Sequence, residues 1–311
     1  GWSASDVSAA AECEYALLRQ LDYRLGRATP IDAREDPLLE HIARLGDRHE
    51  ADVLAQMERH SPVIRLSHAS PPLTHESRTE AAATTLEVLR DAGGAGDVVV
   101  YQAAFYDGEF FGYADFVERA DDGWLVCDAK LARHARPTAL LQLGAYADQL
   151  RRLGLPVSGT VSLLLGSGER ADFPLVDVLP VFAERRERLR ALLADHRAGG
   201  APAEWGADGV LACGRCAECA AAAEAADDVI LVAGVRMSQR RRLRDVGVRT
   251  VADLAAATTA PEGMVPATFE RLRAQAALQA RQRERDHVLG GPAGLEHELT
   301  GDAARTLALL P

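Results

Sequence analysis

Lysine is almost absent from this sequence. Of its 35 lysine and arginine residues only one is a lysine, Lys130, within the stretch "GWLVCDAKLARHARP". The excess of alanine and arginine indicates a GC-rich coding bias, which concerns mutation rather than function. An ammonium group is a compact point charge, whereas a guanidinium group is a wide planar fork. Lys130 therefore marks a position where arginine is expected to fail chemically.

Long apolar runs are absent as well. No stretch approaches the roughly 18 consecutive apolar residues of a membrane-spanning helix. The N-terminal "GWSASD" lacks the basic and apolar segments of a secretion signal. We therefore expect a cytoplasmic protein with no membrane partner. The net charge of −11 argues against a non-specific nucleic-acid coat protein, so a nucleic-acid partner would have to contact local basic patches.

Cysteine is scarce, but its placement is uneven. Three of the five cysteines form the C-x2-C-x2-C pattern "CGRCAEC", at Cys213, Cys216 and Cys219. Cysteines this close in sequence rarely pair into structural disulfides. A tight cluster in a chain without an export signal predicts metal binding in a reducing compartment.

The first two thirds of the chain predict an α/β fold. Three strands joined by the tight turns "YDGEF" and "ADDGW" are expected within residues 97–132. A short strand is expected at "SPVIRLS" and a further strand or hairpin at "SGTVSLLLGSGERADFPLVDV". Apolar periodicity predicts helices over 5–26, 33–59, 76–92, 137–153 and 177–198. This order predicts a mixed sheet covered by helices.

The composition changes after residue 198, and only helices are predicted from there. With 311 residues and 48% hydrophobic composition, the chain is long enough for one large or two modest domains. The predicted organisation is a sheet core over 1–198, a linker with the cysteine cluster over 199–226, a helical region over 227–286, and a linker over 287–311 to a further domain.

Three charged residues on the predicted strands form a candidate active site. Asp128 and Lys130 are two positions apart, so on a strand they project from the same face. A neighbouring antiparallel strand can bring Asp115 of "GYADFVER" beside them. Adjacent carboxylates repel unless a cation lies between them, and Mg²⁺ or Mn²⁺ prefers such oxygen ligands. Lys130 would then orient an attacking water or stabilise charge on a substrate phosphate.

The next predicted helix adds Gln142 and Tyr146, which lie on one helical face because they are four positions apart. "GYAD", "CDAK" and this Q-x3-Y spacing together resemble the PD-(D/E)XK nuclease superfamily, in its RecB-like branch. The resemblance implies a restriction-endonuclease-like fold and a metal site at Asp115 and Asp128. It also implies a catalytic Lys130, with Gln142 and Tyr146 positioning the substrate.

The same resemblance implies a histidine ligand on an upstream helix. The matching segment "LGDRHEADVL" offers His49, with Glu50 as the alternative, because neighbours on a helix diverge by about 100°. The backbone carbonyl of Cys127 is a further expected metal ligand. Strand alternation directs the Cys127 thiol away from Asp128, into the core, where unbonded cysteine is common.

A subset of the RecB-like branch holds a [4Fe-4S] cluster between one cysteine upstream of the nuclease core and three downstream. Cys13, Cys213, Cys216 and Cys219 match that layout, so the resemblance implies such a cluster, and C-x2-C-x2-C is a ferredoxin-like spacing. A four-cysteine zinc site is the alternative, since it uses the same thiolates in a tetrahedral arrangement. Either site would clamp the first helix to the segment after the core.

Two groups of arginines are expected to contact DNA. Arg133 and Arg136 follow the third strand and would face incoming phosphates. Further on, the pattern L-x-x-x-G-V-x-T-V-x-D-L resembles a helix-hairpin-helix, whose glycine turn presents backbone N–H groups to phosphates. Arg240, Arg241 and Arg242 add a local basic patch beside it. The alternative is that these arginines form only a solvated helix face.

The sequence therefore predicts a metal-dependent DNA nuclease, expected to be an exonuclease that acts on single strands or duplex ends in DNA repair or processing. By the same resemblance, its partner would be a fused or associated helicase or second nuclease domain. The alternative is a non-catalytic DNA-binding accessory module of a larger helicase-nuclease, with zinc in place of the iron–sulfur cluster. RNA is a weaker alternative substrate.

Overall fold

A computed structural model of the chain describes residues 1–31, 37–68, 73–94 and 96–289. The chain divides into two compact units, Gly1–Ala203 and Glu204–Pro311. The predicted linker at 287–311 lies outside the described residues from position 290 onward, and its first three residues belong to the last helix. None of the helices in the described ranges combines the length and apolar character needed to cross a membrane.

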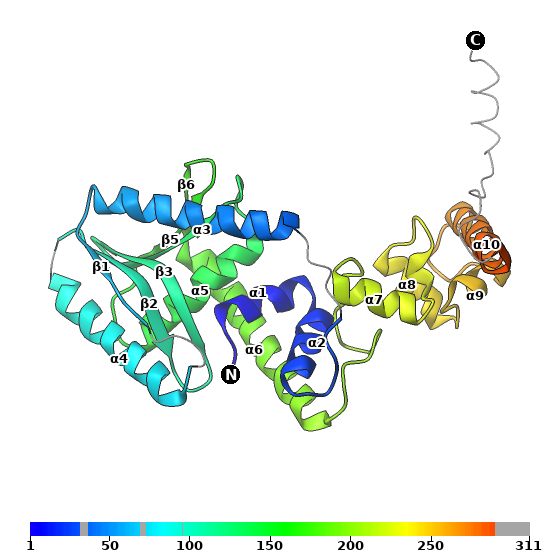
Figure 1. Cartoon of the computed structure of the whole chain (residues 1–311), viewed down its shortest axis with the longest axis horizontal. Helices are drawn as coiled ribbons and strands as arrows, with labels where there is room; N and C mark the ends of the chain where they lie inside the picture. The colour runs from blue at the N-terminus through cyan, green and yellow to red at the C-terminus, as the bar shows by residue number, and fades with distance from the viewer. Residues whose placement is uncertain (32–36, 69–72, 95, 290–311) are drawn as a thin grey trace, which may run out of the picture. The chain divides into compact units, whose positions relative to one another are not determined.

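The first unit is built on a six-stranded mixed sheet, as predicted (Figure 1). Its strands follow chain order across the sheet: β1 Val63–Arg65, β2 Val99–Tyr106, β3 Phe111–Ala120, β4 Gly123–Lys130, β5 Thr160–Leu165 and β6 Arg170–Pro174. The β2–β3–β4 meander is antiparallel, β1 runs parallel to β2, β5 runs parallel to β4, and β6 is antiparallel to β5. The parallel β4–β5 pair needs a crossover, which α5 (Pro137–Arg152) supplies.

The predicted helix over 5–26 is wrong as a single element. The chain forms α1 (Ala4–Glu12) and α2 (Glu14–Arg24), separated by Cys13. Cys13 has an extended backbone (φ −162°, ψ 101°), which ends the first helix and caps the second. Its Sγ accepts the backbone N–H of Ala16 at 3.4 Å, as an N-cap side chain does. The predicted single helix is therefore two helices, and Cys13 lies at the junction between them.

Helices pack on the sheet and on one another. Helix α3 (Pro37–Glu58) buries Leu54 against a sheet cluster made of Val99, Phe116, Leu125 and Cys127. The Cys127 side chain is therefore in the core, where strand alternation predicted it. The remaining helices of this unit are α4 (His75–Asp91) and α6 (Leu175–Gly199), with the short 3-10 turn η1 (Ala92–Gly94). Figure 1 shows α3 lying along the sheet.

The second unit is helical, as predicted. It contains α7 (Ala217–Ala225), α8 (Met237–Asp245), α9 (Val251–Ala256) and α10 (Pro266–Leu289), with the 3-10 turn η2 (Val229–Leu231). Its core is an apolar cluster that includes Val229, Leu243, Leu254, Phe269 and Leu272. The α8–α9 turn carries Gly247 at φ +85°, a left-handed conformation that favours glycine. This glycine turn lies within the sequence pattern that resembles a helix-hairpin-helix, and the resemblance stays a prediction.

Helices α5 and α6 approach closely at Gly144. A Cβ atom on Gly144 would lie 2.9 Å from the Cβ of Phe182 and 3.1 Å from Cγ1 of Val178. Gly46, in α3, has no such neighbour within 4 Å. We therefore expect Gly144→Ala to lower the free energy of unfolding by about 1–3 kcal/mol through overpacking.

Gly46→Ala is the matched control. It removes the same backbone freedom without a clash and is expected to raise the stability by about 0.5–1 kcal/mol. Denaturant unfolding of both variants measures the difference. Equal and small effects of the two substitutions would contradict the close packing of α5 on α6.

Candidate active site

The register of β3 and β4 brings the two aspartates together. Phe116 pairs with Cys127, so Asp115 and Asp128 occupy the next positions on the two antiparallel strands. One Asp115 oxygen, Oδ2, accepts the backbone N–H of Ala129 at 3.1 Å. The Lys130 Nζ lies 2.6 Å from Oδ2 of Asp128. Two carboxylates and one ammonium group therefore meet at the end of the meander.

The electrostatics of this group favour a cation. Burial, followed by the charge of Asp128 and a hydrogen bond to it, raises the pKa of Asp115 to about 9, and Glu50 adds to the rise while Lys130 opposes it. Asp128 is 6% exposed, and its Oδ2 accepts no well-aligned hydrogen bond from the described residues despite the ion pair with Lys130. A buried carboxylate oxygen with spare acceptor capacity, beside a second carboxylate, fits a hard divalent ion such as Mg²⁺ or Mn²⁺.

Helix α5 contributes the two residues expected to position substrate. Tyr146 is buried, and its ring packs 5.8 Å from that of Phe105. Burial, then the negative charges of Asp128 and Asp115, raises the pKa of its hydroxyl. Gln142 lies one turn earlier, where it lines a cavity of about 690 Å³ together with Lys130. The structure therefore brings both α5 residues to the charged group.

The two arginines after β4 lie on the loop that leads into α5. Arg133 and Arg136 are exposed, and Arg136 lines the cavity that Lys130 and Gln142 share. Arg136 is also the N-cap residue of α5, and its side chain makes no capping hydrogen bond.

The two neighbouring candidates on α3 point to different partners. The Nε2 of His49 lies 2.9 Å from the backbone carbonyl oxygen of Leu164 in β5. His49 also lines a separate cavity of about 470 Å³ that Glu118 and Arg170 share. Glu50, in contrast, acts electrostatically on Asp115. Glu50 therefore lies within electrostatic reach of Asp115, whereas the His49 ring contacts the Leu164 carbonyl.

Two residues of β2 hold Glu50, and neither was singled out from the sequence. The hydroxyl of Tyr101 and the amide of Gln102 donate to the same Glu50 oxygen, at 2.8 and 2.9 Å. Burial and then Glu50 raise the pKa of Tyr101 to about 12. Gln102 has φ 58°, a left-handed conformation that costs a residue with a side chain about 1–3 kcal/mol. Nothing in the residue types of "VVVYQAAFY" signals that conformation.

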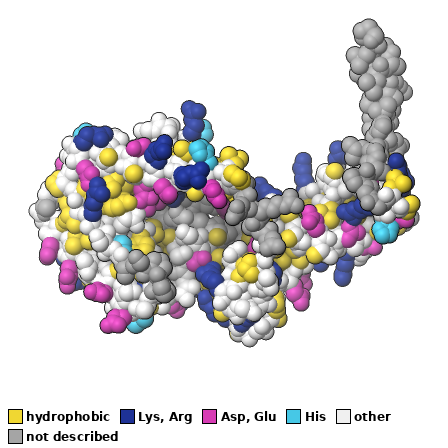
Figure 2. Space-filling model, in the orientation of Figure 1, with side chains coloured by type: hydrophobic (Ala, Val, Ile, Leu, Met, Phe, Trp, Pro, Cys, Tyr) yellow, Lys and Arg dark blue, Asp and Glu magenta, His cyan; other side chains and the backbone are white. Residues whose placement is uncertain are grey.

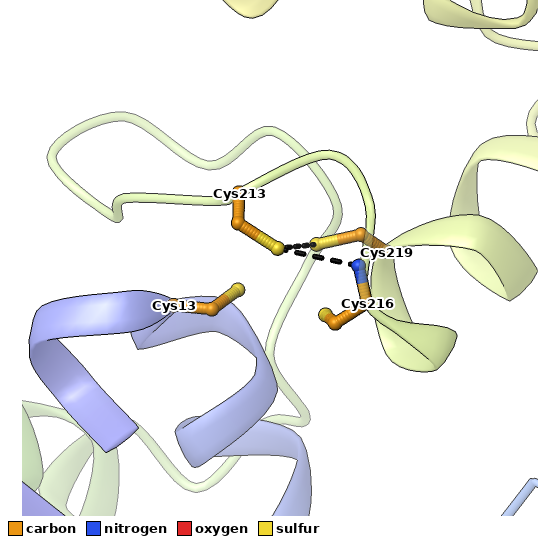
Figure 3. Close-up of side chains that lie close together, drawn as sticks. All are labelled: Cys13, Cys213, Cys216 and Cys219. Carbon is orange, nitrogen blue, oxygen red and sulfur yellow. Dashed lines mark hydrogen bonds between the residues drawn. The ribbon is translucent and has the colours of Figure 1, made fainter. Parts of the chain in front are cut away.

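The cysteines of the predicted cluster converge (Figure 3). The sulfur atoms of Cys13, Cys213, Cys216 and Cys219 all lie within 4.8 Å of one another. Within the "CGRC" turn, the Cys213 sulfur accepts the backbone N–H groups of Arg215 at 3.5 Å and Cys216 at 3.3 Å. Cysteine binds metals through its sulfur, and a metal-bound sulfur can still accept such backbone N–H groups. The donor set fits a thiolate-bound metal centre.

The three arginines proposed for the basic patch of α8 differ in environment. Arg241 and Arg242 are exposed, and Arg242 donates to the carbonyl oxygen of Gly263. Arg240 is 5% exposed, and its guanidinium forms two hydrogen bonds with Asp228, at 2.8 and 2.7 Å. This buried pairing gives Arg240 a structural role and corrects its expected contact with DNA. On the face drawn in Figure 2, acidic and basic side chains are interspersed.

Comparison with known proteins agrees with this geometry. Residues 1–223 match the family model described as the PD-(D/E)XK nuclease superfamily. The matched range contains the strands with Asp115, Asp128 and Lys130 and also the four clustered cysteines. A search of curated proteins finds no match. Because the family match covers well over half of the chain, the chain belongs to the PD-(D/E)XK nuclease superfamily.

Proposed function

We propose that this protein is a metal-dependent deoxyribonuclease that hydrolyses phosphodiester bonds at the end of the β3–β4 meander. One observation carries the proposal: Asp115, Asp128 and Lys130 meet within hydrogen-bonding distance in a buried site. Family membership makes the chain a nuclease domain, and nuclease domains of this superfamily use divalent metals. The particular metal and the DNA substrate are the proposed part.

The residues of the site divide into metal ligands and substrate contacts. Asp115 and Asp128 would hold Mg²⁺ or Mn²⁺, with the Cys127 carbonyl as a further ligand. The ion, when bound, would polarise the phosphate and lower the pKa of a bound water. Lys130 supplies a mobile point charge that donates to the attacking water or to a phosphate oxygen. Gln142 and Tyr146, on the α5 face beside the cavity, would orient the substrate.

The third protein ligand is either His49 or Glu50. The family resemblance favours His49, whereas two observations support Glu50: its influence on Asp115 and its rigid support by Tyr101 and Gln102. A carboxylate is also the harder ligand, and Mg²⁺ prefers oxygen to nitrogen. We therefore propose Glu50 as the ligand and keep His49 as the alternative.

The type of cleavage, the biological role and the partner are inferred from the resemblance to the RecB-like branch. We propose an exonuclease of DNA repair or processing that acts on single strands or duplex ends, with a fused or associated helicase or second nuclease domain as its partner. Arg133 and Arg136 would meet incoming phosphates, since both are exposed beside the site. Arg241 and Arg242 keep the exposure that a phosphate contact requires.

The four-cysteine site is proposed to hold a structural [4Fe-4S] cluster, with zinc as the alternative. The C-x2-C-x2-C spacing and the upstream cysteine support the cluster. One distance favours zinc: the sulfurs of Cys213 and Cys219 are 3.9 Å apart. That separation is close to the edge of about 3.8 Å in a tetrahedron with 2.3 Å zinc–sulfur bonds. The thiolates of a cubane lie farther apart, because each binds a different iron atom.

Loss of the charged group is expected to abolish cleavage. With Mn²⁺ and labelled single-stranded DNA, Asp115→Ala and Lys130→Arg should each lower the cleavage rate about 100- to 1,000-fold. Asp115→Ala removes a charge placed for the transition state, and Lys130→Arg replaces a compact donor by a shape that cannot take its position. Lys130→Arg keeps the charge but widens the cation. Asp121→Ala, in the exposed β3–β4 turn, is the matched control. Full activity of Asp115→Ala would contradict the proposal, and DNA binding without cleavage would favour the non-catalytic accessory module.

Metal titration separates the two candidates on α3. Glu50→Gln is expected to raise the Mn²⁺ concentration for half-maximal activity about 10- to 100-fold, because it removes an anionic oxygen while keeping the side chain's shape. His49→Gln should raise it less, because the His49 ring is hydrogen-bonded to the Leu164 carbonyl. The opposite order would make His49 the ligand.

Spectra and metal analysis decide the content of the cysteine site. A [4Fe-4S] protein purified without oxygen is expected to be brown, with absorbance near about 400 nm. Cys216→Ser should remove the colour completely and lower the melting temperature, since metal binding stabilises the folded chain. Cys127→Ala is the control, because this buried thiol lies in the sheet core. A colourless wild-type protein with stoichiometric zinc would establish the zinc alternative.

A further inference from the structure

The cavity beside Lys130 is large enough to receive part of a ligand next to the proposed catalytic residues. It measures about 690 Å³, within the roughly 300–1,000 Å³ of ordinary ligand pockets. Lys130 and Gln142 lie on its wall, and α1, the loop after β4 and the start of α5 complete it. Leu163 and Leu165 pair in register with Asp128 and Lys130, so their side chains line the space one strand away from the catalytic residues.

The wall of the cavity is apolar on one side and polar on another. Ile42 and Leu131 form the exposed aliphatic part, whereas Leu163 and Leu165 are buried. The polar part includes Glu12 and Thr138, whose side-chain oxygens are 3.4 Å apart. Arg136 and His134 are exposed lining residues on the loop after β4. A ligand that fits this wall has flat apolar faces, a polar edge and a negative charge next to it.

We propose that this cavity receives one unpaired nucleobase of the strand being cleaved, adjacent to the scissile phosphate. The proposal rests on the proposed nuclease function and specifies its substrate. A phosphate placed against the aliphatic side chains would lose hydration without a compensating partner there. A base would instead bury its faces against the exposed side chains of Ile42 and Leu131, and its edge would reach Glu12 and Thr138. Its phosphates would lie toward Lys130 and Arg136.

The pocket gives a reason for a preference among nucleic acid forms. A base inside a duplex is stacked and paired, so bringing it into the cavity costs a few kcal/mol, whereas a base in a single strand is already accessible. A pocket that requires an unpaired base therefore selects single strands and frayed ends over duplex interiors. Because the contacts are mostly to the faces of the base, the selection should depend little on sequence.

Binding measured in EDTA tests the pocket without requiring catalysis. Fluorescence anisotropy compares a labelled single-stranded DNA with an abasic strand of the same length. Wild-type protein is expected to bind the normal strand about tenfold more tightly, because the abasic strand has no base to bury in the cavity. Ala135→Leu, which fills the cavity, and Ile42→Ala, which trims its wall, should both reduce that ratio toward one.

Val176→Ala is the matched control. Val176 is an exposed aliphatic residue of α6 that does not line the cavity, so its loss should leave the ratio unchanged. Equal binding of the normal and abasic strands by wild-type protein would overturn the proposal. So would a ratio that neither Ala135→Leu nor Ile42→Ala changes, or a failure to bind either strand.

A second measurement separates this proposal from the nuclease function. Mn²⁺ is added to the same wild-type protein and strands. Cleavage without discrimination between normal and abasic binding overturns the base pocket and leaves the nuclease function standing. Discrimination in EDTA without any cleavage in Mn²⁺ or Mg²⁺ supports the pocket and overturns the nuclease function. Cleavage of single strands at least tenfold faster than duplex interiors, lost in Ala135→Leu, supports both.

Discussion

The repulsion between Asp115 and Asp128 is the constraint on which the rest of the active site depends. Both carboxylates leave water when β3 and β4 pair, and burial of a charge without compensation is costly. The Ala129 N–H and the Lys130 ammonium offset part of that cost, but the raised pKa of Asp115 shows that they do not remove it. The two carboxylates can therefore both be ionised only with a further cation beside them, and such a pair fits a divalent ion.

This repulsion also bears on the residues that hold Glu50 in place. Tyr101 and Gln102 hold Glu50 where its charge acts on Asp115, and a purely structural site would avoid such an added negative charge. Gln102 does so from a left-handed backbone conformation, and strain of this kind persists only where the surrounding structure enforces it. A strained residue that orients a third carboxylate is consistent with function rather than with stability.

The sequence predicted the elements that depend on local periodicity. Strand alternation alone placed Asp128 and Lys130 on one face, and the turn signals gave the meander that brings Asp115 beside them. The choice between His49 and Glu50 could not be made in this way, because it depends on the rotation of α3 about its axis. That rotation is set by the packing of Leu54 on the sheet, a tertiary contact.

Two other features could not be predicted from the periodic spacing of apolar residues. The break at Cys13 interrupts a segment whose apolar spacing is helical throughout, so only the capping role of the thiol reveals it. Arg240 looked like its neighbours in an arginine-rich run, yet it pairs with Asp228 and lies over the ring of Trp205. Burial raises the pKa of Asp228, but the hydrogen bonds from Arg240, Ile230 and Trp205 and the charge of Arg240 together outweigh it, so the pKa is lowered. A guanidinium can make two parallel bonds to one carboxylate and stack on an indole, which an ammonium cannot do.

The contrast between Arg240 and Lys130 offers a chemical reason for a single lysine in an arginine-rich chain. Arginine serves well where a cation must be fixed by several flat contacts, as at Asp228. At Asp128 the cation sits 2.6 Å from one oxygen, beside an open cavity, with its side chain 34% exposed. In the proposed mechanism that position calls for a single compact donor able to rotate between the carboxylate, a water and an arriving phosphate. A coding bias can convert the other cationic positions to arginine, but it cannot supply that donor here.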